Sequence, residues 1–422
     1  MGLDSAPRTV TAERLVEWYV PNGLARSPSD SWVAALDERA REIAACGAHC
    51  GDGPATFLEA VYGEAMATAV RTSDRPAGNR TDAWLDDLDR RLRRIGSDGP
   101  HDRSAVSFVA NAYGRALATV LVTLPSDDVD GIRIDPRLDE LAGRMRRALV
   151  DDSGGESTSS VLEYVYSLVL TALADALDDG PTTDEAVQRR FETVHTMILR
   201  VAAGEDTERQ PAVFVLTTYT LAAVRRASGT FPGIDDGWHA AFVDRAIDTV
   251  DPSTFYREYV DSIVAMDGVS LAWLRWTVED AIDRSADADD RERWVATVAT
   301  VIADVVAACI HLAGETGDER ADDILTDTTQ AVAALDTDDP AFFEAVRTAV
   351  DAKLVHDHGD EPAYWQWRTR LERSVRERRD QDGMPDDRST ASDDHPSSSD
   401  DRSTASDDHP SSSDDRSTAP DD

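Results

Sequence analysis

Apolar residues recur three or four positions apart through most of the chain, a pattern that predicts α-helices with one buried side. In WVAALDERAREI, residues 32–43, a single apolar stripe runs between charged positions. Other segments are apolar almost all round, such as FLEAVYGEAMATAV at residues 57–70. No run of useful length alternates apolar and polar residues with the period of two that a half-buried strand requires. The sequence therefore predicts an all-α protein.

The most apolar segments recur at a nearly constant interval. Each carries a tyrosine near its middle, at Tyr62, Tyr113, Tyr166 and Tyr219, so the intervals are 51, 53 and 53 residues. The first two copies share the pattern Tyr-Gly-x-Ala-x-Ala-Thr. With only nine tyrosines in the chain, chance does not easily give such spacing. We interpret the chain as tandem repeats of about 52 residues.

Each repeat contains two helices of different character. An amphipathic helix, here called helix A, precedes the apolar tyrosine-bearing helix, here called helix B. Two clear examples of helix A are WLDDLDRRLRRI at 84–95 and RLDELAGRMRRAL at 137–149. One hairpin cannot bury its helix B alone, so successive hairpins must stack around a shared core. The fold prediction is tandem helical hairpins in an α-solenoid-like or α/α-toroid array.

Two glycines and four tyrosines are the predicted packing residues of this array. A glycine inside a helix costs about 1 kcal/mol relative to alanine, so its presence predicts close approach of two helices. The buried tyrosines are expected to reach a repeated polar partner or the boundary between the helix layers. The predicted packing residues are Tyr62, Gly63, Tyr113, Gly114, Tyr166 and Tyr219.

The predicted domain organisation follows from where the repeat pattern begins and where it is no longer recognisable in the sequence. Residues 1–30 form an N-terminal segment with a short helix, 31–290 about five hairpins, and 291–379 divergent helices that cap the array. The fifth helix B is expected in SLAWLRWTVEDAI, residues 270–282, with Trp276 near the tyrosine position.

Residues 380–422 are predicted to be a disordered acidic tail. The 14-residue sequence DDRSTASDDHPSSS occupies 386–399 and recurs unchanged at 400–413. It offers no apolar residue able to nucleate a core.

The charge of the chain is strongly negative along its whole length. Its 82 acidic residues outnumber its 43 basic ones, which gives a formal net charge of −39. Lys353 is the only lysine. This composition resembles that of proteins from extreme halophiles. In molar salt the Debye length is about 3 Å, so the repulsion between like charges of the chain is screened. The alternative is a polyanion that mimics nucleic acid or captures cations. We expect adaptation to high salt, and the overall negative charge disfavours nonspecific binding of nucleic acid.

The sequence predicts a cytoplasmic protein. The N-terminus contains no apolar segment of signal-peptide length, and the cysteines Cys46, Cys50 and Cys309 are too few for a disulfide framework. Residues 106–125 and 294–314 are apolar enough to suggest membrane spans, but each has polar or charged residues near its middle. We predict buried helices there and no membrane partner.

The sequence offers few candidates for a metal site. Cys46, His49 and Cys50 supply at most three of the four ligands of a structural zinc site, so they are weak candidates. Glu192 and His195 have the Glu-x-x-His spacing of di-iron bundles, but no second copy exists. We expect no metal and no cofactor.

The signs of catalysis are also sparse. No P-loop, Gly-x-Ser-x-Gly, His-Glu-x-x-His or Gly-x-Gly-x-x-Gly pattern occurs. Two acidic clusters resemble the aspartate-rich helices of isoprenoid synthases, though a solvated helix face explains them as well. These clusters are Glu279, Asp280 and Asp283, and Asp322, Asp323 and Asp327.

The last helix, at 361–379, suggests one further activity. Arg373, Arg376 and Arg379 near its end are candidate nucleic-acid contacts. The alternative is that this helix docks on the array and its arginines face the acidic protein. Nucleic acid is therefore not the expected partner.

The function predicted from sequence is a non-catalytic scaffold. Stacked hairpins are similar in architecture to tetratricopeptide and HEAT arrays, which bind other proteins, although their signature residues are absent here. We therefore expect a protein partner in a high-salt cytoplasm. The alternatives are an α/α-toroid enzyme with a central cavity, or a regulator that contacts nucleic acid through 361–379.

Overall fold

The computed structural model divides the chain into two units, Met1–Arg378 and Arg379–Asp422. Of the second unit only residues 379–381 are described, so most of the predicted tail, and its expected disorder, lies outside the described residues. The described residues are 10–24, 31–47, 53–72, 79–98, 103–123, 134–152, 157–177, 184–204, 207–229, 237–286, 288–358 and 362–381.

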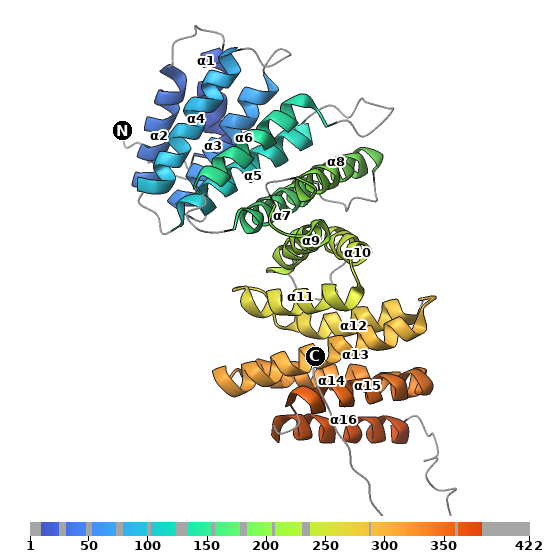
Figure 1. Cartoon of the computed structure of the whole chain (residues 1–422). Helices are drawn as coiled ribbons and strands as arrows, with labels where there is room; N and C mark the ends of the chain where they lie inside the picture. The colour runs from blue at the N-terminus through green and yellow to red at the C-terminus, as the bar shows by residue number, and fades with distance from the viewer. Residues whose placement is uncertain are drawn as a thin grey trace, which may run out of the picture. The chain divides into compact units, whose positions relative to one another are not determined.

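Those stretches form sixteen α-helices and no β-strand (Figure 1). The prediction of an all-α protein is therefore confirmed. The helices are α1 (Ala12–Leu24), α2 (Ser31–Cys46), α3 (Pro54–Arg71), α4 (Asn79–Asp98), α5 (Ala105–Thr123), α6 (Pro136–Asp152), α7 (Thr158–Ala176), α8 (Glu185–Ala202), α9 (Pro211–Ala227), α10 (Gly237–Thr249), α11 (Pro252–Ala265), α12 (Ala272–Ala286), α13 (Arg291–Thr316), α14 (Glu319–Asp338), α15 (Pro340–His358) and α16 (Pro362–Gln381).

Proline and aspartate mark where many of these helices begin. Pro54 and Pro211 lie in the first turns of α3 and α9, where a missing N–H costs no hydrogen bond. The Asp184 side chain accepts a hydrogen bond from the backbone N–H of Ala186 and so caps α8. The polar segments between the apolar runs therefore act as helix boundaries.

The helices alternate between two layers. The B layer consists of α1, α3, α5, α7, α9, α11, α13 and α15, each packed on the next. The A layer consists of α2, α4, α6, α8, α10, α12 and α14, and each packs on the B-layer helix that follows it. α16 comes last, with side-chain contacts to α14 and α15. This is the predicted array of tandem helical hairpins.

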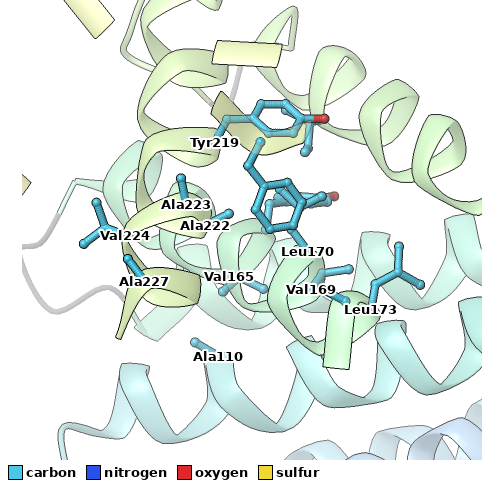
Figure 2. Close-up of a cluster of buried hydrophobic side chains, with 14 of the residues drawn as sticks. Ala110, Val165, Val169, Leu170, Leu173, Tyr219, Ala222, Ala223, Val224 and Ala227 are labelled. Atoms are coloured by element: carbon cyan, nitrogen blue, oxygen red, sulfur yellow. The ribbon is translucent and has the colours of Figure 1, made fainter. Parts of the chain in front are cut away.

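The hairpins share a core that continues from one repeat to the next. Figure 2 shows part of it, where aliphatic side chains of α7 meet small side chains of α9. Because alanines dominate the labelled α9 side, side chains of α7 can pack close to the α9 backbone. The labelled side chains are Ala110 of α5, Val165, Val169, Leu170 and Leu173 of α7, and Tyr219, Ala222, Ala223, Val224 and Ala227 of α9.

The fifth helix B is α11, and the expectation that it lies at 270–282 is wrong. α11 packs on α9 and α13, whereas α12 packs on α13 and α14 and belongs to the A layer. The segment of α11 carries Arg257, Glu258 and Asp261, so it is more polar than the earlier B helices. The fifth hairpin therefore ends near Ala265, and α12 and α13 form the next one.

Two B-layer helices are long and apolar enough to cross a membrane. α5 lies between α3 and α7, and 72% of its most apolar window is buried inside the protein. α13 packs on α11, α12, α14 and α15, with 50% of its window buried. Their apolar composition therefore fits the core positions that they occupy.

Candidate functional site

A hydrogen bond between the two layers recurs along the array. Each joins the hydroxyl of a buried B-layer tyrosine to a side chain of an A-layer helix, in most cases 24 or 25 residues away. The repeated tyrosine thus has its polar end satisfied at the boundary between the layers. The pairs are Tyr62–Asp37 (2.7 Å), Tyr113–Asp89 (2.9 Å), Tyr219–His195 (3.0 Å), Tyr256–Asp280 (2.7 Å) and Tyr259–His239 (2.8 Å).

Asp37 shows how one such carboxylate is held. It accepts hydrogen bonds from Tyr62, from Arg41 of its own helix and from Arg91 of α4 (3.0 Å). Burial alone would raise the pKa of this carboxyl, but the hydrogen bonds from Arg41, Tyr62 and Arg91 outweigh it and lower the pKa. Asp37 therefore stays ionised and joins α2, α3 and α4.

Tyr166 breaks this pattern. It is buried like the other tyrosines, but the α6 residue 24 positions before it is Ala142, which has no polar side chain. The third hairpin thus keeps the aromatic packing of the repeat and lacks its interlayer bond.

The A layer has its own set of connections between repeats. An arginine of one A-layer helix pairs with a carboxylate of the preceding A-layer helix. These contacts connect successive A-layer helices along the array. The pairs are Arg91–Asp37, Arg144–Asp82, Arg245–Glu192 and Arg284–Asp244.

The two repeat glycines lie where B-layer helices come close together. A Cβ placed on Gly63 would lie 2.9 Å from the backbone oxygen of Ala112 and 2.9 Å from Arg115 Cβ. A Cβ placed on Gly114 would lie 3.2 Å from Leu168 Cβ. There is no room at Gly63 for a side chain unless α3 and α5 move apart.

Three of the five candidate metal residues of the sequence, Cys46, Glu192 and His195, lie within the described part of the chain. His49 and Cys50 lie outside the described residues, whereas Cys46 is exposed and its Sγ donates to the backbone oxygen of Ile43. Glu192 pairs with Arg245, and His195 bonds Tyr219. In the described part of the chain no three His, Cys, Asp or Glu side chains are grouped to hold a metal ion.

Four of the six carboxylates in the two acidic clusters predicted from the sequence are engaged in contacts within the array. Asp280 accepts from Tyr256 and Arg284, which are side chains of α11 and α12. Asp322 pairs with Arg370 of α16, and Arg275 bridges Glu279 and Asp327. These carboxylates therefore link neighbouring helices.

The predicted nucleic-acid contacts all lie on α16. Arg373 and Arg376 are exposed, and Arg379 is half-buried. Other arginines of the same helix hold it on the array, since Arg370 pairs with Asp322 and Arg378 donates to Thr337.

The B layer has a face that points away from the A layer. The tyrosines of the B layer point toward the A layer, where their hydroxyls are bonded. In a helix of 3.6 residues per turn, a residue two positions from the tyrosine lies about 200° around the axis, on the opposite side. We call the surface formed by these opposite sides the open face. Its central positions, two before and two after each tyrosine, are Ala60, Glu64, Asn111, Arg115, Tyr164, Leu168, Thr217 and Leu221.

A chain of polar contacts crosses the open face from α3 to α9. Asn111 donates to the buried Glu59 (3.1 Å) and accepts a hydrogen bond from the Tyr164 hydroxyl (3.3 Å). The guanidinium carbon of Arg225 lies 4.4 Å from the centre of the Tyr164 ring. Arg225 Nε also donates to Ser167 Oγ (3.2 Å). These contacts hold the half-buried Tyr164 and Arg225 in place.

Two buried glutamates lie three residues before a repeat tyrosine, and their surroundings differ. Glu59 is bonded by both Arg103 and Asn111. Glu163 pairs with Arg209 through Oε2 (3.1 Å), whereas its buried Oε1 has no hydrogen-bond partner among the described residues. Burial raises the pKa of Glu163 to about 7 against the opposing effect of Arg209, and the carboxylate of Glu258 adds to the rise.

A cleft of about 590 Å³ opens where α7, α9 and the turn after α11 come together. Its lining includes Asp175 of α7, Arg225 and Arg226 at the end of α9, and Met266 and Asp267 after α11. An isolated β-bridge between Ser228 and Val269 holds the end of α9 to the turn before α12. The cleft has walls from three repeats and contains side chains of both charges.

Arg225 and Tyr164 were not predicted from the sequence. The signal available was weak, because Tyr164 lies two positions before Tyr166 as Asn111 does before Tyr113. The contact between Tyr164 and Arg225 joins two repeats, and spacing along one helix does not indicate it.

No protein-family model matches the chain, and no curated protein matches it. Among solved structures it is similar to a protein described as "Circular tandem repeat protein with novel repeat topology and enhanced subunit contact surfaces". The two share 16% sequence identity and a TM-score of 0.34, over 88% of this chain and 90% of that chain. The fold is shown by the helices of this chain and the contacts between them.

Proposed function

We propose that this protein is a non-catalytic helical-repeat scaffold that binds a protein partner on the open face of its B layer, in a high-salt cytoplasm. The observation that carries the proposal is the line of side chains Asn111, Tyr164 and Arg225, which crosses three repeats and leads into the cleft. Asn111 is buried and supports Tyr164, so a partner that lies across these hairpins can contact Tyr164 and Arg225 at once.

The composition of the open face suits a protein partner. Tyr164, Leu168 and Leu221 are half-buried, and Val213 in the first turn of α9 is 39% exposed. Aromatic and arginine side chains fixed among such residues are typical of the centres of protein interfaces. The A layer presents many charged side chains, and arginine–carboxylate pairs such as Arg91–Asp37 and Arg245–Glu192 already join its repeats.

The acidic charge supports the high-salt setting. At −39, the chain repels itself and other acidic proteins unless salt screens the charges. A partner must then be recognised through short-range contacts, and the open face supplies apolar, aromatic and hydrogen-bonding groups for them.

The test is co-purification of partners from the native cells at their own salt concentration, with two matched double variants. The open-face variant is Arg115→Glu with Val213→Glu, and the A-layer control is Arg94→Glu with Leu199→Glu. All four side chains are exposed, so both variants should fold. We expect a stoichiometric protein with the unmodified chain and the control, and its loss with the open-face variant. Retention by the open-face variant, or absence of any stoichiometric partner, contradicts the proposal.

A further inference from the structure

Arg225 differs from the other arginine of the cleft in what it pairs with. Arg226 pairs with Asp175 at 2.6 Å. Arg225 donates from Nε to Ser167 and lies against Tyr164, and no carboxylate of the described residues lies within ion-pair distance of it. A guanidinium has five N–H donors, so the donors on its two terminal nitrogens remain for a ligand.

The setting of Arg225 favours a carboxylate as that ligand. Guanidinium and carboxylate groups match as planar, bidentate partners. Contact with Tyr164 and Ser167 holds the side chain in place, which lowers the entropy lost on binding. Molar salt removes long-range attraction, but a contact of this kind persists because the groups touch.

The other charged side chains of the cleft limit the number of carboxylates that its ligand can carry. Asp175 is neutralised by Arg226, but Asp267 is exposed and has no ion-pair partner among the described residues. Its charge repels a second carboxylate that enters the cleft. A run of acidic residues therefore fits less well than a single one.

We propose that the cleft binds one carboxylate of an extended peptide segment of the protein partner through the terminal nitrogens of Arg225. This inference rests on the proposed function, because the ligand is part of the partner bound on the open face. The carboxylate comes from an aspartate or glutamate side chain or from a chain terminus. The volume of about 590 Å³ accommodates such a side chain together with its flanking backbone.

The test uses a displayed library of random 12-residue peptides, selected on the full chain in 2 M potassium chloride. We expect enrichment of peptides with one Asp or Glu at a constant position. Synthetic copies should bind Arg225→Gln at least about tenfold more weakly than the unmodified chain. They should bind Arg226→Gln within about threefold of it, since Arg226 is already paired.

A variant at Asp267 and two changes to the selected peptides test the role of the carboxylate separately from the role of Arg225. Asp267→Asn should tighten binding, because it removes the repulsion. Replacing the peptide's Glu by Gln should weaken binding if the side chain is the ligand, and amidation of the C-terminus should weaken it if the terminus is. Enriched peptides without an acid, unchanged binding by Arg225→Gln, weaker binding by Asp267→Asn, or no enrichment at all overturns the inference. If the stoichiometric partner still co-purifies in that case, the proposed function stands and only the cleft's role is wrong.

Discussion

The hydroxyl of Tyr62 donates a 2.7 Å hydrogen bond to Asp37, and this bond joins the B layer to the A layer within the first hairpin. Asp37 also accepts a hydrogen bond from Arg91 of the next hairpin at 3.0 Å. One buried carboxylate thus connects the two layers and two successive repeats. The same arrangement of a B-layer tyrosine and an A-layer partner recurs at Tyr113 and Tyr219.

The interlayer bond should contribute measurably to stability. Tyr113→Phe removes the hydroxyl that donates to Asp89 and leaves the ring in the core. We expect a loss of about 1.5–3 kcal/mol in the free energy of unfolding, since a hydrogen bond to a charged group contributes about that much. Chemical denaturation at constant salt measures it.

The matched control is Tyr166→Phe. Ala142 stands where the A-layer partner would be, so this change should cost less than about 0.5 kcal/mol. Equal losses for the two variants would show that the hydroxyl–carboxylate bond does not hold the layers together.

Gly63 should not tolerate alanine, although alanine is the better helix former. The added Cβ would lie 2.9 Å from the Ala112 backbone oxygen, so α3 and α5 must separate. We expect a net loss of about 1–3 kcal/mol, because the strain exceeds the gain of about 1 kcal/mol in helix propensity. Thermal or chemical unfolding of Gly63→Ala provides the measurement.

Gly143→Ala is the control for this change. Gly143 lies inside α6, and its added Cβ would meet only the flexible end of Arg147 at 3.6 Å. This substitution should stabilise the protein by up to about 1 kcal/mol. If both substitutions stabilise, the close approach of α3 and α5 at Gly63 is not a constraint.

Glu163 should make the stability of the protein depend on pH near neutrality. Its pKa is raised from 4.5 to about 7 by burial, so the folded state binds a proton that the unfolded state has released. Stability contributed by this site is present below pH 4.5 and is lost as the pH rises to about 7. Glu163→Gln, which cannot ionise, should therefore gain stability relative to the unmodified chain over that interval, by about 1–3 kcal/mol.

Denaturation of both proteins at several pH values between 4.5 and 8 measures this difference. Glu59→Gln serves as the control, because Arg103 and Asn111 already bond the Glu59 carboxylate. That variant should lose stability near neutral pH. A difference between Glu163→Gln and the unmodified chain that stays constant with pH would show that Glu163 ionises normally.

Salt should stabilise the folded chain. Its charge of −39 destabilises the compact state when the Debye length is long, and about 1 M salt shortens that length to about 3 Å. We expect the thermal midpoint to rise steeply with potassium chloride. Below about 0.3 M, potassium nitrate should raise the thermal midpoint as much as potassium chloride does, because screening then dominates over effects specific to the anion. A midpoint that falls or stays constant with salt contradicts the high-salt adaptation.

The sequence predicts the repeat well because the evidence for it is local. Tyr62, Tyr113, Tyr166 and Tyr219 recur within helices whose periodicity is visible in the chain itself. The prediction from periodicity was wrong at α11. This segment places Tyr256 and Tyr259 among charged residues, so its sequence resembles that of an A-layer helix. Layer assignment depends on which neighbours cover a helix, and periodicity within one helix does not report that.

The candidate site was less accessible to prediction for a related reason. Arg225 appears in the sequence as one of two arginines at a helix end, a common position that favours the helix dipole. Its distinct role appears only when Tyr164 and Ser167 of α7 lie beside it and Asp175 is found to pair with Arg226 instead. Such contacts join repeats about 50 residues apart, and no motif within one repeat encodes them.

The most direct test of the scaffold proposal is site-specific photo-crosslinking in the native cells. A photoreactive phenylalanine analogue is placed at Arg115 or Leu221 on the open face, and at Arg94 or Leu199 on the A layer as the control. We predict a crosslinked protein of one defined mass at both open-face positions and none at the A-layer positions. Adducts confined to the A layer, or no adduct at any position, would contradict the proposal that the open face binds a protein partner.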